Sequence, residues 1–170
     1  NNAEQLYKKY QLKRVYYSAY SPIPDSDPTL PAIIPPLVRE HRLYQADWLI
    51  RFYGFTVNEI TPPEAPDLDN ELDPKTSWAL RNFSYFPIDI NRASKEQLLR
   101  IPGIGVRSVE KILKIRRYHQ LTLEDLIRLH IALNRAKNFI ICRGYNPRDN
   151  NVSVIKQQLK PKAQQLLLPF

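Results

Sequence analysis

Residues 89–117 read DINRASKEQLLRIPGIGVRSVEKILKIRR, and this stretch decides the fold expected for the 170-residue chain. Ser94 and Gln97 have the spacing of a capping box, so either Ser94 or Asn91 is expected to cap a short helix. Pro102 ends that helix, because a proline cannot continue its hydrogen-bonding pattern. The sequence therefore predicts a helix, a tight glycine turn and a second helix in close succession.

The turn, Gly103-Ile104-Gly105, has the chemistry of an anion site. Without a Cβ atom, Gly103 and Gly105 let the backbone approach a phosphate group and point amides at its oxygen atoms, beside the positive end of a helix. Such contacts do not read bases, so the expected binding is to a sugar-phosphate backbone and independent of sequence. The apolar face of the second helix turns inward, which leaves four basic side chains for solvent or a ligand: Arg107, Lys111, Lys114 and Arg117.

Ile101 followed by Pro-Gly-Ile-Gly resembles the helix-hairpin-helix motif of DNA repair and recombination proteins. A nucleotide-binding Gly-x-Gly-x-x-Gly motif does not fit, because position 108 is Ser. In addition, that motif requires a strand before the glycines, whereas a helix is expected there. The resemblance implies contact with DNA through the phosphate backbone of a duplex.

An imperfect internal repeat follows the motif. A shift of 28 residues superposes LLRI at 98–101 on LIRL at 126–129, Arg107 on Arg135, and Ile112 on Ile140. Thr122 and Asp125 are expected to cap the third helix. Because His130-Ile131-Ala132-Leu133 replaces Pro-Gly-Ile-Gly, the second hairpin is expected to serve mainly as packing support, with Arg135 and Lys137 as weaker phosphate contacts.

Residues 89–145 are thus predicted to form a tandem helix-hairpin-helix domain. The residues expected to contact DNA are Pro102, Gly103, Ile104, Gly105, Val106, Arg107, Ser108, Lys111, Lys114 and Arg135.

Charge supports a polyanionic partner. The formal net charge is +8 and the sequence pI is near 9.6. Residues 89–145 hold 12 Lys and Arg against 5 Asp and Glu, a net of +7, whereas the rest of the chain has a net of +1. The positive charge is therefore concentrated in the predicted DNA-binding domain.

Composition excludes several other classes. One cysteine, Cys142, and three histidines cannot supply a disulfide framework, a structural zinc site or an iron-sulfur cluster. The sequence has no apolar run near the roughly 20 residues of a membrane span and no signal peptide, so a cytoplasmic protein without a membrane partner is expected. It starts Asn1-Asn2-Ala3 and contains no methionine, so a fragment of a longer protein is expected.

The remaining chain is expected to form three regions. Residues 1–58 contain a strand at 12–20, which is rich in β-branched and aromatic residues, and an amphipathic helix at 37–53. Residues 59–88 form a connector whose first part, 59–73, has six acids, no bases and three prolines, followed by a short helix from Pro74 to Arg81. Residues 146–170 have no clear periodicity, and a mobile tail is favoured over a docked extension.

A wider resemblance covers most of the chain up to about residue 145. The segments LKRVYYSAYSPI, LVREHRLYQADWLIRFYGF, LDPKTSWALRN and FPIDINRA are similar to the C-terminal half of a bacterial family of DNA modification or repair radical S-adenosylmethionine proteins. The resemblance implies a mainly α fold, with a strand and helices that end a partial (β/α) barrel before the tandem domain. The 4Fe-4S cluster and S-adenosylmethionine are then expected only in a missing N-terminal part, because this chain lacks the Cys-x-x-x-Cys-x-x-Cys motif.

Three functions compete on the sequence alone. The first is sequence-independent binding of duplex DNA, with a DNA-repair protein as a second kind of partner. The second is a protein-interaction or bracing module without DNA affinity. A hydrolase is disfavoured, because no Ser-His-Asp grouping, HExxH or paired-carboxylate motif is found and no residue is predicted to be catalytic.

Individual reactive and aromatic residues are given ordinary structural roles. Cys142 is expected to be a small buried residue within a helix. Tyr16, Tyr17 and Tyr20 have the chemistry to stack on bases, but packing is the favoured role for tyrosines in a strand.

Overall fold

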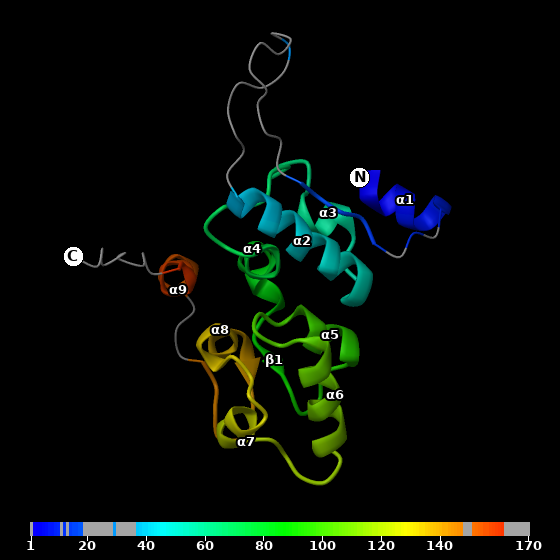
Figure 1. The fold of residues 1–170 in the computed structure, drawn as a ribbon. Coiled ribbons are helices and arrows are strands. Elements are labelled where there is room, and N and C mark those ends of the chain that lie inside the picture. The colour runs from blue at the N-terminus through cyan, green and yellow to red at the C-terminus, as the bar shows by residue number, and fades with distance from the viewer. Residues whose placement is uncertain are drawn as a thin grey trace, which may run out of the picture. The chain divides into compact units, whose positions relative to one another are not determined.

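A computed structural model describes residues 2–10, 12, 14–18, 29, 37–147 and 151–161. The chain divides into two compact units, Asn1–Trp78 and Ala79–Phe170. The described residues are mainly helical, as expected from the sequence (Figure 1). None of the helices in this part of the chain is long and apolar enough to cross a lipid bilayer.

The first unit is built around α2 (Leu37–Phe52), which confirms the helix expected at 37–53 to within one residue. Gly54 follows it with φ +69°, the left-handed conformation that commonly ends a helix. α1 (Asn2–Tyr10), a helix not predicted from the sequence, and the short α3 (Val57–Ile60) belong to the same unit. α4 (Pro74–Arg81) has the predicted bounds and spans the boundary between the units.

The strand expected at residues 12–20 is wrong for the part of it that the structure describes, and the rest lies outside the described residues. Tyr44 Oη accepts the N–H of Tyr17 at 3.0 Å and donates to its carbonyl at 2.8 Å. Tyr7 Oη accepts the N–H of Val15 at 3.0 Å. Strand-forming side chains favour a strand only where a neighbouring strand is present. Here tyrosines of α1 and α2 take the hydrogen bonds instead.

The second unit contains two successive helix pairs and a small sheet (Figure 1). The first pair is α5 (Lys95–Arg100) and α6 (Val106–Ile115), and the second is α7 (Leu123–Arg128) and α8 (Leu133–Ala136). Short 3₁₀ helices lie at η1 (Phe83–Tyr85) and η2 (Lys137–Phe139). β1 (Ile88–Asp89) pairs in parallel with β2 (Ile140–Ile141), so the sheet joins the segments that precede the first pair and follow the second.

The core of the second unit draws on both helix pairs and on the sheet. Phe139 is its largest fully buried side chain, and its ring meets those of Phe86 and Phe83 edge-on, with centroids 5.0 and 6.0 Å apart. Burial of this apolar surface is the main favourable term that holds the two helix pairs together. The other fully buried side chains of this core include Ile90, Leu98, Ile101, Ile104, Val109, Ile112, Leu121, Leu126, Ile140 and Ile155.

The mobile tail expected from residue 146 is wrong for residues 151–161. They contain α9 (Val152–Leu159), which Asn151 caps through its side chain. Ile155 is fully buried, and Asn138 Nδ2 donates to Gln158 Oε1 at 3.4 Å. Val152 and Leu159 are the other side chains of α9 that are not exposed, at three and four residues from Ile155, so the helical spacing extends over only two turns and is a weak signal in the sequence. Residues 162–170 lie outside the described part of the chain.

Candidate nucleic-acid interface

Ser94, one of the two predicted caps, is the residue that starts α5. Its hydroxyl accepts the N–H of Gln97 at 3.2 Å, and Gln97 Oε1 accepts the N–H of Ser94 at 2.8 Å, which confirms the capping box. Asn91 does not cap this helix. Its side chain instead bonds twice to the backbone of Leu121, accepting from the N–H at 2.7 Å and donating to the carbonyl at 3.2 Å.

The first hairpin loop, residues 101–105, turns its large side chains into the core. Ile101 and Ile104 are almost completely buried, and Pro102 is buried as well. These side chains therefore shape the loop, and only its backbone remains for a ligand. A DNA contact at Pro102 or Ile104 would therefore have to be made by main-chain atoms.

Gly105 is the N-cap residue of α6 and has the backbone geometry of a capped helix start. Its φ and ψ, −99° and 172°, are close to the −108° and 174° of Thr122, whose side chain caps α7. A glycine cannot supply that cap, and no side-chain cap hydrogen bond is found at this helix end among the residues that the structure describes. The first N–H groups of α6 have no carbonyl partner within the helix, so they remain as donors for an anion.

Three exposed cations continue from this helix end along α6. Arg107, Lys111 and Lys114 are all exposed, and their spacing of four and three residues places them on one helix face. We call Arg107, Lys111 and Lys114 the basic stripe. Val106 and Ser108, also predicted to contact DNA, are half-buried beside it. The opposite face of α6 carries the buried Val109 and Ile112.

The second hairpin departs from the predicted repeat after its first helix. Thr122 and Asp125 form the expected capping box of α7, and the N–H of Thr122 is the main reason that the pKa of Asp125 is lowered. From helix C-cap to N-cap the first loop runs from Ile101 to Gly105, whereas the second runs from Leu129 to Ala132. The second loop is one residue shorter.

This shorter loop changes the repeat from 28 residues to 27 beyond the turn. Arg107 therefore corresponds to Asn134 and not, as predicted, to Arg135. The predicted pairing of Ile112 with Ile140 is wrong as well, because Ile140 lies in β2. His130 takes the position of Gly103, and both have positive φ, +58° and +78°.

Gly103 lies against the second hairpin. A Cβ atom at Gly103 would come within 2.7 Å of the Ala132 carbonyl oxygen and 3.0 Å of Arg135 Cβ. The predicted reason for this glycine, space for a phosphate, is therefore wrong, because the space is occupied by α8 and the residue before it. The same contact brings the half-buried Arg135 beside the first loop, so two predicted site residues 32 positions apart are neighbours.

Cys142 is buried, as predicted, but it lies in an extended bridge with Tyr145 and not in a helix. Burial, with smaller contributions from the charges of Asp89 and Asp125, raises the pKa of its thiol from near 9 to about 11. A thiol of this kind is a packing residue, since the thiolate is the reactive form.

Alkylation of Cys142 by iodoacetamide at pH 7.5 is expected to be at least about a hundredfold slower in the folded chain than in urea, because the raised pKa lowers the thiolate fraction by that factor and burial blocks access. Mass spectrometry of quenched samples gives both rates from the one cysteine. Equal rates would contradict the buried position.

The described residues contain no group of three or more His, Cys, Asp or Glu side chains that could hold a metal ion. A cluster held by three thiolates does not fit this chain, whose sequence has one cysteine. The polar groups that the structure brings together at the candidate interface are the backbone amides at the start of α6 and the cations of the basic stripe.

Comparison of the chain with protein-family models, with curated proteins and with solved structures gives no match.

Proposed function

We propose that the second unit binds DNA independently of sequence, through phosphate contacts made by the first hairpin loop and the basic stripe. The observation that carries this proposal is the uncapped N-terminus of α6. Gly105 has capping geometry and no side chain, and the exposed Arg107 lies two residues further on. A phosphate oxygen at this position would accept from the free amides and meet the positive end of the helix dipole.

The basic stripe supports the same function. Arg107, Lys111 and Lys114 extend over about two turns of α6, or roughly 10 Å at 1.5 Å per residue. That length is greater than the distance between neighbouring phosphates of a nucleic-acid strand, so the stripe can contact more than one of them. No catalytic role is proposed for any residue of this chain.

The competing function is a protein-interaction module without DNA affinity. Salt dependence separates the two, because phosphate contacts release condensed counterions and a buried apolar protein contact does not. Duplex affinity that falls steeply with salt supports DNA binding. Capture of a protein partner that is insensitive to salt, in a chain without duplex affinity, would support the alternative.

Replacing both Arg107 and Lys111 with alanine is expected to reduce the magnitude of the slope of log affinity against log salt concentration by about two. Each cation removed from a phosphate lowers that slope by about one. Fluorescence anisotropy with a blunt duplex, repeated at several salt concentrations, measures the slope directly.

The matched control removes two exposed cations from the first unit, as Lys9→Ala with Arg14→Ala. This variant has the same net charge as the first, so an effect of overall charge would appear in both. An unchanged slope in the Arg107 and Lys111 variant would place the DNA-binding surface elsewhere.

A further inference from the structure

Tyr118 is the most exposed large apolar side chain of the described residues, at 82%. It follows α6 in a turn in which its N–H donates to the Ile115 carbonyl at 2.9 Å. Its position continues the basic stripe, because it lies four residues after Lys114 in a chain that is still turning helically. The stripe of three cations thus ends at an exposed aromatic ring, and Arg117 beside it is exposed as well.

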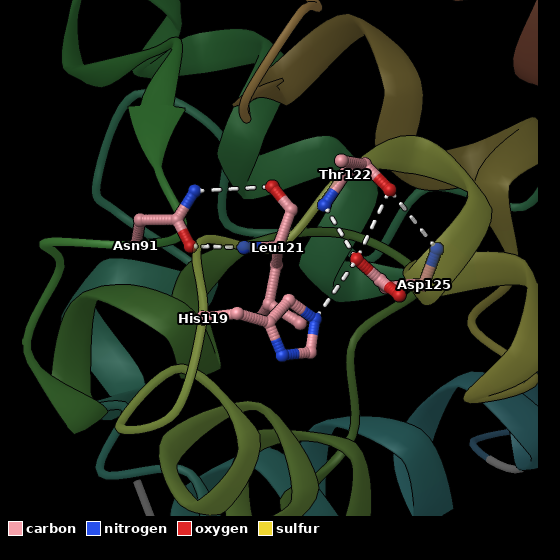
Figure 2. Close-up of polar contacts among 5 residues, drawn as sticks. All are labelled: Asn91, His119, Leu121, Thr122 and Asp125. Carbon is pink, nitrogen blue, oxygen red and sulfur yellow. Dashed lines mark hydrogen bonds and ion pairs between the residues drawn. The ribbon is translucent and has the colours of Figure 1, made fainter.

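The loop that carries Tyr118 is fixed at both ends to one short segment, residues 90–93. On the N-terminal side of the loop, Arg116 Nη1 donates to the carbonyls of Ile90 and Ala93 at 3.1 and 2.6 Å. On the C-terminal side, the Asn91 side chain holds both backbone groups of Leu121 (Figure 2).

A third contact fixes the middle of the loop. His119 Nε2 lies 3.2 Å from Asp125 Oδ2, which also accepts from the N–H and hydroxyl of Thr122 at 3.0 Å each (Figure 2). The neighbours of Tyr118 are therefore held by α7 and by residues 90–93, while its own ring stays in solvent. Because the loop backbone is already fixed, binding of a planar group by this ring would order the side chain alone and not the loop.

An exposed tyrosine at the end of a cationic helix face fits an unpaired base. Bases within a duplex are stacked on one another and offer no free face, whereas the bases of a single strand can stack on an aromatic ring. From Arg107 to Tyr118 the helix rise gives roughly 16 Å, the length of a few nucleotides. A strand that follows the stripe would therefore bring one of its next bases to Tyr118.

We infer that Tyr118 is a stacking platform for an unpaired base, and that the preferred ligand of this unit is a duplex with an adjoining single-stranded tail. This inference rests on the proposed function: the hairpin loop and the stripe hold the phosphate backbone, and Tyr118 adds a preference for DNA that is partly unpaired.

The test compares a blunt duplex with the same duplex carrying a ten-nucleotide thymidine tail, using the full chain and fluorescence anisotropy. The tail is expected to increase affinity about tenfold in the parent, and Tyr118→Ala is expected to remove that gain while leaving the affinity for the blunt duplex unchanged. Tyr118→Phe keeps the ring and is expected to keep the gain. A 2-aminopurine base moved along the tail should show a fluorescence change at one position, which Tyr118→Ala abolishes.

Tyr16→Ala is the matched control, because Tyr16 is 75% exposed and lies in the first unit. It is expected to bind both ligands as the parent does. The inference would be overturned if the tail adds no affinity, or if the gain in affinity from the tail survives in Tyr118→Ala. In either case, binding of the blunt duplex would still support the proposed function. Absence of binding to either DNA would overturn the proposed function itself.

Discussion

Replacing Gly103 with alanine is expected to lower the free energy of unfolding of the second unit by about 2–4 kcal/mol. Two costs add. The residue has φ +78°, which a side chain disfavours by about 1–2 kcal/mol, and the new Cβ would lie 2.7 Å from the Ala132 carbonyl oxygen, a backbone atom that cannot rotate away. Urea unfolding followed by far-UV circular dichroism measures the change, and amide hydrogen exchange in α5 to α8 assigns it to this unit.

Gly144→Ala is the matched control for this substitution. Gly144 lies in the same unit with φ +76°, but a Cβ atom there would meet nothing within 4 Å. It therefore reports the cost of the backbone conformation alone, about 1–2 kcal/mol. If Gly103→Ala is no more destabilising than Gly144→Ala, the contact between the first hairpin loop and the second hairpin does not contribute to stability.

The features that could be predicted from the sequence are local ones. The capping boxes at Ser94 and Thr122 join residues three positions apart, so the side chains that form them can be recognised without knowing the rest of the fold. The same holds for the break at Pro102 and for α2, whose existence depends on helical spacing within one segment.

The features that could not be predicted depend on distant partners. β1 and β2 have two residues each and pair across 52 positions, and Asn91 recognises Leu121 across 30. Neither pattern leaves a trace in nearby sequence. The predicted alignment of the second loop fails because the signal at His130 is weak: histidine is enriched at positive φ relative to most residues, but only a small fraction of non-glycine residues adopt it.

The two glycines of the first hairpin loop differ in what the structure requires of them. Both were predicted to serve a phosphate, since both lack a Cβ atom in a tight turn. In the structure Gly103 serves the packing of one hairpin against the other, whereas Gly105 is in an extended conformation that any residue can adopt. The backbone dihedral angles at 105 therefore do not require a glycine, and close approach of a phosphate to the amides of α6 is the reason proposed here for its presence.

Gly105→Asp is expected to stabilise the second unit by about 0.5 kcal/mol and to weaken binding of a blunt duplex about a hundredfold. Aspartate is among the best N-cap residues, and the backbone at 105 already matches that of the capping residue Thr122. Its carboxylate would take the free amides of α6 and place a negative charge where the phosphate is proposed to lie. Urea unfolding and fluorescence anisotropy measure the two changes on the same preparation.

In Gly105→Asp the stability is expected to rise while the affinity for DNA falls. Partial unfolding would lower both, so the two explanations can be distinguished. Gly105→Ser offers a cap without charge and should give a similar stability with a smaller loss of affinity, about tenfold, because the hydroxyl competes for the amides but does not repel DNA. Asn58→Asp, at an exposed position of α3 in the first unit, adds the same charge away from the interface and should leave duplex affinity unchanged. If Gly105→Asp binds the duplex as tightly as the parent chain, the N-terminus of α6 is not the phosphate site, and the glycine at its start has another cause.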